Sequence, residues 1–183
     1  AVDCIASLGC DEFRMDDWGV DVMVAACQKG LMTPPGISFV WFSEAARLRG
    51  GKSDLATPYW AWGPRADAEE FWQHWDGTAP TSHLFGLREA LDMIHEEGLP
   101  NVWKRHNTLA ATVWAAFDAW SAGNPAIAMN VADPVHRGWS VTAARFGAPH
   151  ATRLREWCET RAGVTLGIGL GMAPSSDPAY HGF

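Results

Sequence analysis

Three short apolar runs near the start of the chain alternate with polar, turn-rich segments. Residues 1–6, 20–25 and 37–42 each have the length of a strand, and the last two are rich in β-branched or aromatic side chains. The segment from 9 to 19 is polar and glycine-bounded, and Pro34-Pro35-Gly36 is a strong turn signal. The pattern therefore predicts three strands joined by turns.

From residue 43 onward the apolar positions follow helical spacing. Ser43 is placed to cap a short helix, and Asp67 is placed to cap a helix over residues 68–75. Apolar side chains recur every three to four positions over residues 82–97 and again over residues 101–122. Two long amphipathic helices are expected there.

The last third of the chain changes to shorter elements. The expected order is strand, strand, helix and strand, over residues 126–130, 139–146, 151–161 and 163–170. Such a group after a long helix suggests a smaller α+β domain, with the boundary near residues 121–126. We expect an α/β fold in two parts, residues 1–122 and residues 123–183.

Composition and charge narrow the classes of partner. The formal net charge is −7, and no run of Lys or Arg exists, so nucleic acids are not expected partners. No apolar run reaches the roughly 20 residues of a membrane span. The four cysteines form no CxxC pair and have no histidine at zinc-ligand spacing, so we expect no metal, reduced thiols and a cytoplasmic location.

Lys29 and Asp3 are the candidate chemical groups. Lys29 directly follows an apolar strand, at the edge where open α/β sheets bind ligands, and is a candidate nucleophile. Asp3 lies in the preceding apolar run, where a carboxylate needs a charged partner. A lysine and an acid are the two groups that pyridoxal phosphate (PLP) requires. The alternatives are a solvated turn lysine and a strand-end cap or surface acid.

Several segments resemble class V aminotransferases of the alanine–glyoxylate and serine–glyoxylate type. They are Val-Asp-Cys-Ile-Ala-Ser-Leu-Gly at 2–9, Trp-Gly-Val-Asp at 18–21, Gln-Lys-Gly-Leu-Met-Thr-Pro-Pro-Gly at 28–36, the stretch 77–97, and Gly-Ile-Gly-Leu-Gly at 167–171. The resemblance implies the PLP-dependent transferase fold type I. Residues 1–122 would be the C-terminal part of the large cofactor-binding domain with its connecting helix, and residues 123–183 most of the small domain.

The resemblance also implies residue roles. Lys29 would form the Schiff base with PLP and act as the catalytic residue, Asp3 would bond the pyridine nitrogen, and Gln28 would contact the cofactor. Thr78 would reach the cofactor phosphate of the neighbouring subunit, which implies a homodimer. The implied reaction moves an amino group from serine or alanine to glyoxylate and gives glycine and a keto acid.

Two positions depart from the family pattern, and two alternatives remain. Trp75 stands where tyrosine is frequent, and Cys27 stands where serine is usual. The start and end of the chain suggest a piece of a longer protein, so the 183 residues alone are expected to be inactive. The alternatives are another reaction on the same fold, such as a lyase or desulfurase, and a non-catalytic or truncated chain that retains the fold.

Overall fold

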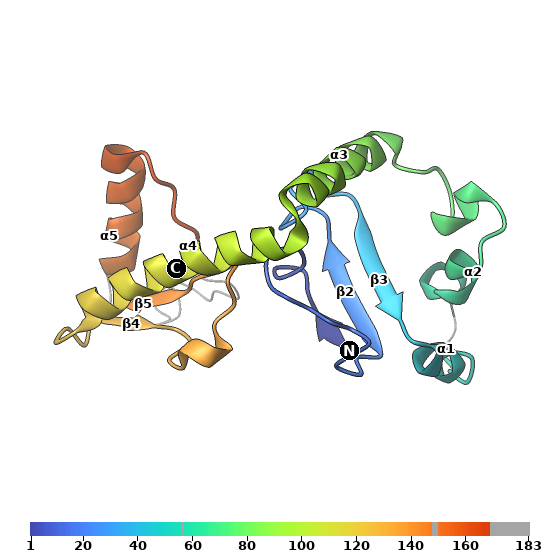
Figure 1. The fold of residues 1–183 in the computed structure, drawn as a ribbon, viewed down its shortest axis with the longest axis horizontal. Helices are drawn as coiled ribbons and strands as arrows, with labels where there is room; N and C mark the ends of the chain where they lie inside the picture. The colour runs from blue at the N-terminus through green and yellow to red at the C-terminus, as the bar shows by residue number, and fades with distance from the viewer. Residues whose placement is uncertain (56, 148–149, 169–183) are drawn as a thin grey trace. The chain divides into compact units, whose positions relative to one another are not determined.

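The computed structural model describes residues 1–55, 57–147 and 150–168. The chain forms two compact units, Ala1–Trp103 and Lys104–Phe183, which are coloured from blue to red along the chain in Figure 1. The division falls inside α4 (Leu99–Ser121). The domain boundary expected near residues 121–126 stays a prediction.

A three-stranded mixed sheet lies in the first unit. Its strands are β1 (Val2–Asp3), β2 (Val22–Ala26) and β3 (Ser38–Phe42), in the order β1-β2-β3. β1 runs parallel to β2, and β3 runs antiparallel to β2, with Ala26 opposite Ser38. The carboxyl ends of β1 and β2 and the amino end of β3 therefore share one edge of the sheet.

The three predicted strands exist, but the first is shorter than expected. The run over residues 1–6 forms a strand only at Val2–Asp3. Cys4 still donates its N–H to Val24 O at 2.8 Å, but its own carbonyl accepts from Leu8 N at 2.9 Å and begins a turn. Apolar composition does not distinguish a strand from a buried turn, because both place side chains in the core.

Helix α3 (Thr81–Glu97) covers the end of the sheet where β2 finishes and β3 begins, as Figure 1 shows. Its Leu87 packs into a buried cluster with Cys27, Leu31 and Ile37. A second cluster is formed by Cys4, Met23 and Ala25. The first cluster anchors the loop that follows β2, because Cys27 and Leu31 belong to that loop.

The segment between β3 and α3 contains only short helical pieces. They are α1 (Glu44–Gly50), a 3-10 turn (Pro58–Trp60), α2 (Gly63–Ala66) and a second 3-10 turn (Phe71–His74). The cap at Ser43 is confirmed, since its Oγ accepts from Ala46 N at 3.1 Å.

The predicted helix over residues 68–75 is wrong. Asp67 ends α2 instead of capping a new helix, and its carboxylate binds the guanidinium of Arg47. Arg65 binds the carboxylate of Asp76 at 3.2 Å. These bonds hold the segment as a loop with a single 3-10 turn.

The second unit contains a two-stranded antiparallel sheet. After α4 come β4 (Ile127–Met129), a 3-10 turn (Pro134–His136), β5 (Ala144–Phe146), α5 (His150–Trp157) and a π-helical turn (Cys158–Ala162). The long helices predicted over residues 82–97 and 101–122 are confirmed as α3 and α4, within two residues at each end.

Two strand predictions in this unit need correction. The strand predicted over 139–146 is limited to Ala144–Phe146. Thr142 accepts a hydrogen bond from Trp114 Nε1 at 3.1 Å, which ties this stretch to α4 rather than to a strand ladder. The described part of the strand predicted over 163–170 is irregular, and residues 169 and 170 lie outside the described residues.

No helix in ranges 1–55, 57–147 and 150–168 is long and apolar enough to cross a membrane. The same residues hold no group of three or more His, Cys, Asp or Glu side chains that could bind a metal ion.

The close packing at Gly30 gives a testable difference between two glycines. A Cβ at Gly30 would overlap the carbonyl oxygen of Leu8 and lie 2.8 Å from Cys10 Sγ, and a backbone atom cannot move cheaply. We expect Gly30→Ala to lower the free energy of unfolding by about 1–3 kcal/mol in a urea titration.

The matched control is Gly86→Ala in the middle of α3, where no atom lies within 4 Å of an added Cβ. Alanine favours a helix interior by about 0.5–1 kcal/mol over glycine, so this variant should be more stable than the wild type. Equal effects of the two substitutions would contradict the packing described at Gly30.

Candidate active site

Lys29 and Asp3 lie at the same edge of the sheet. Lys29 follows the carboxyl end of β2 by three residues, and Asp3 is the last residue of the parallel strand β1. Both side chains are exposed. No hydrogen bond or ion pair joins them in the described part of the chain, so both groups are accessible to a ligand.

Lys29 lies in a loop of residues 27–37, here called the lysine loop, that closes on Cys27. Cys27 N donates to Ile37 O at 3.1 Å, and Ile37 N donates back to Cys27 Sγ at 3.4 Å. The thiol donates to Pro34 O at 3.2 Å. Thr33 donates both its N–H and its hydroxyl to Cys27 O, at 3.2 and 3.0 Å.

The lysine loop has a buried base and an exposed tip. Cys27 is 0% exposed, and Leu31, Thr33 and Ile37 are also buried. Gln28 and Lys29 are exposed beside one another. The core therefore fixes the base of the loop, and the amine is presented from its tip.

A second contact ties the lysine loop to the segment that follows β1. The space beside Gly30 is filled by Leu8 O and Cys10 Sγ, and Gly9 approaches Gly30 O closely. A side chain at position 30 would separate the two segments. The segment that follows β1 and the loop that carries Lys29 are thus packed directly against each other at Gly30.

The Asp3 carboxylate caps the end of β1 with one oxygen and leaves the other oxygen without a bond among the described residues. Its Oδ1 accepts from Ile5 N at 2.8 Å, the bond expected of a cap. Oδ2 has no hydrogen-bond partner among the described residues. One carboxylate oxygen can therefore accept a bond from a ligand while the other maintains the turn.

Thr78 is exposed, two residues before Pro80, which precedes the first turn of α3. The described residues show no hydrogen bond between Thr78 and Asp3, Gln28 or Lys29. Trp75 packs against the buried cluster under the lysine loop, and its Nε1 is buried without a partner. The Trp75 ring is therefore part of the packing around this cluster in its own chain.

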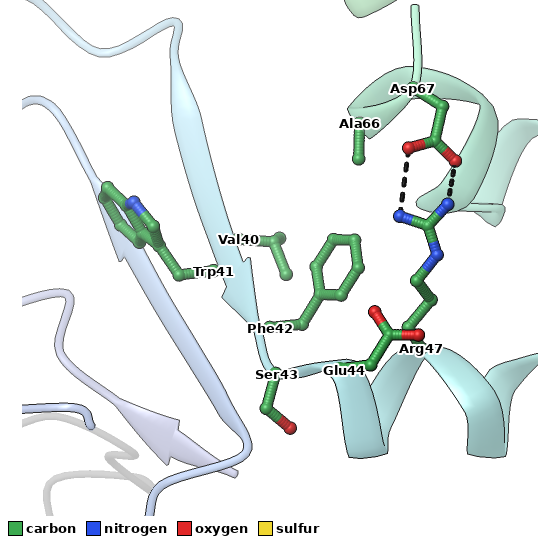
Figure 2. Close-up of a pocket in the computed structure, with 8 residues that line it drawn as sticks. All are labelled: Val40, Trp41, Phe42, Ser43, Glu44, Arg47, Ala66 and Asp67. Atoms are coloured by element: carbon green, nitrogen blue, oxygen red, sulfur yellow. Dashed lines mark hydrogen bonds and ion pairs between the residues drawn. The ribbon is translucent and has the colours of Figure 1, made fainter. Parts of the chain in front are cut away.

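A surface hollow of about 320 Å³ lies at the other end of the sheet. Phe42, which lines it, is opposite Val22 at the start of β2, whereas Lys29 follows the end of that strand. Figure 2 shows Arg47 bound by both carboxylate oxygens of Asp67. Hydrogen bonding to Asp67 raises the pKa of Arg47, and the Asp67 carboxylate is the partner of this guanidinium in the hollow.

One residue of the lysine loop was not singled out by the sequence. Thr33 is the buried polar side chain of the first unit, 8% exposed, and its hydroxyl closes the loop around Lys29. The sequence feature that could have indicated this role is the hydroxyl side chain between Met32 and Pro34. That signal is weak, because threonine in a turn is usually solvated.

The groups at this edge fit PLP. The cofactor needs a lysine amine for its aldehyde and an acid for its ring nitrogen. Among the described residues, the Lys29 amine and one oxygen of Asp3 have no partner, and both lie at the same edge of the sheet. No rearrangement of the core is needed to use either group.

Comparison with known proteins identifies relatives of the same kind. The profile of the family described as "Aminotransferase class-V" matches residues 1–177. L-aspartate–glyoxylate aminotransferase of Paracoccus denitrificans is 40% identical over 129 residues, 65% of this chain and 30% of that protein. Serine–glyoxylate aminotransferase of Arabidopsis thaliana is 36% identical over 123 residues, 67% of this chain and 31% of that protein.

Solved structures agree with this relationship. Alanine–glyoxylate aminotransferase from Nostoc sp. superposes with a TM-score of 0.73 at 27% identity, over 93% of this chain and 44% of that one. The chain thus spans between 30% and 44% of the length of these relatives. The mixed sheet with its lysine loop has the fold type I architecture of PLP-dependent aminotransferases, and the chain belongs to the class V aminotransferase family.

Proposed function

We propose that the protein carrying this chain is a PLP-dependent aminotransferase that transfers an amino group from serine or alanine to glyoxylate. The observation that carries the proposal is the fixed presentation of Lys29 at the sheet edge that also holds Asp3. The names of the relatives share glyoxylate and differ in the amino donor, which includes aspartate. Glyoxylate is therefore the firmer part of the substrate assignment.

Each candidate residue has a defined task in this proposal. Lys29 would hold PLP through its Nζ and, once released by the substrate amine, would move the proton that leaves the substrate Cα. PLP, when bound, supplies the electron sink that makes the Cα proton removable. Asp3 accepts a hydrogen bond from the protonated ring nitrogen, and Gln28 contacts the cofactor beside the lysine.

Thr78 extends the proposal to a homodimer. Its hydroxyl would contact the cofactor phosphate of the partner subunit. Its exposure and position directly before α3 leave the hydroxyl accessible to such a ligand. Trp75 would make no such contact, because its ring is packed into the core.

Borohydride reduction tests the attachment residue. After incubation with PLP and reduction, we expect a single adduct on Lys29, located by peptide mass, because its exposed amine makes no bond to any described residue that would compete with the aldehyde. The chain has three lysines, Lys29, Lys52 and Lys104, so scattered labelling is easily recognised. Lys29→Arg should abolish the adduct, and the matched variant Lys52→Arg should retain it.

Equal labelling of the three lysines, or no labelling in the protein that carries the whole family fold, would contradict the proposal. If Lys29 is labelled, assays with serine, alanine and aspartate against glyoxylate separate the donors. Release of sulfur from cysteine without amino transfer would instead indicate a desulfurase.

The substitution Asp3→Asn tests whether the negative charge of Asp3 contributes to the reaction. The amide oxygen can still accept from Ile5 N, so the turn is retained while the negative charge is lost. We expect the Lys29 adduct to form, and the exchange of the substrate Cα proton to slow by about 10²-fold, as for loss of one electrostatic contact to developing charge. Proton exchange measured by NMR reports this step.

Asp16→Asn, an exposed acid outside the site, is the control and should exchange at the wild-type rate. Wild-type exchange in Asp3→Asn would show that the carboxylate is only a strand-end cap.

A further inference from the structure

We propose that Thr33 is a positioning residue for Lys29, because its hydroxyl holds the lysine loop in the form that presents the amine at the sheet edge. This inference rests on the proposed function of Lys29. It concerns a residue that contacts neither cofactor nor substrate and acts only through the loop backbone.

The bonds of Thr33 close the loop on both sides of Lys29. Thr33 N and Oγ1 both donate to Cys27 O, at 3.2 and 3.0 Å, and Lys29 lies between these two residues. Cys27 is 0% and Thr33 is 8% exposed, so water does not compete for the bonds. These two bonds therefore join the ends of the segment 27–33, which contains Lys29.

The placement of the Lys29 side chain depends on the conformation of the loop backbone. Its side chain is exposed and has no hydrogen-bond or ion-pair partner in the described part of the chain. Its one backbone tie within the loop is the bond from Met32 N to Lys29 O at 2.9 Å. The position of the amine relative to Asp3 is therefore set by the path of the loop backbone.

That backbone is strained next to Thr33. Met32 has φ 57°, in the left-handed region that residues with a β-carbon avoid. The strained residue would relax if its neighbours allowed it. The two bonds of Thr33 hold the residue that follows Met32, and the thiol of Cys27 holds Pro34 beyond it.

The hydroxyl can be removed without changing the shape of the core. Valine has the shape of threonine, and Cys27 O would keep the N–H bond from position 33. The variant Thr33→Val should therefore fold with a looser lysine loop. Thr33→Ser keeps the hydroxyl and should restore the bond.

The control removes a hydroxyl-to-carbonyl bond at an exposed helical position outside the lysine loop. Thr112 Oγ1 donates to Thr108 O at 2.8 Å within α4. Thr112→Val loses a hydroxyl-to-carbonyl bond that has no part in the lysine loop. A general effect of threonine-to-valine substitution would appear in this variant as well.

Two measurements test the proposal. The dissociation constant for PLP, from the visible absorbance of the Lys29 adduct, should rise about fivefold to tenfold in Thr33→Val, the effect of one lost buried hydrogen bond. It should stay within about twofold of wild type in Thr33→Ser and Thr112→Val. Hydrogen exchange of the backbone amides of residues 28–33, in the cofactor-free protein, should be faster in Thr33→Val alone.

The outcomes separate this inference from the proposed function. If wild type forms the Lys29 adduct and Thr33→Val binds PLP as wild type does, the positioning role is wrong. If wild type forms no adduct at Lys29, the proposed function fails. The amide exchange measurement alone then tests whether Thr33 holds the lysine loop. Unchanged exchange in Thr33→Val would then overturn the inference as well.

Discussion

The closure of the lysine loop on Cys27 is the interaction on which the rest of the site depends. Cys27 is fully buried, and its N–H, carbonyl and thiol all bond to other residues of the loop. An exposed lysine on an open loop would sample many positions, at a large entropic cost to any reaction that needs one of them. Because the base of the lysine loop is buried, only the side chain of Lys29 remains to be ordered.

The direction of the strands supplies the second constraint. β1 and β2 are parallel, so Asp3 and Lys29 leave the sheet at one edge although 18 residues separate Asp3 from the start of β2. The contact of Gly30 with the segment after β1 fixes the spacing between them. An acid for the ring nitrogen and an amine for the aldehyde thus come from two adjacent segments held by one core.

The sequence predicted those elements whose formation depends on residues close together in the chain. The three strands, α3, α4 and the cap at Ser43 follow from apolar spacing and capping chemistry, and the shared edge of Asp3 and Lys29 follows from strand order. The helix expected over residues 68–75 was wrong because Asp67, taken as its cap, ends α2 and binds Arg47, 20 residues away in the sequence. The Thr33 bond was missed because burial of a turn hydroxyl cannot be read from its neighbours.

Trp75 shows how a departure from the family pattern can be accommodated. Its ring packs on the cluster that contains Cys27 and Ile37, and its Nε1 has no partner, so burial of the ring outweighs an unsatisfied donor. This packing anchors the segment that leads to Thr78. In the proposed homodimer, Lys29 would serve the cofactor of its own subunit and Thr78 that of the partner. Because both segments rest on one cluster, a change in that core would affect both sites.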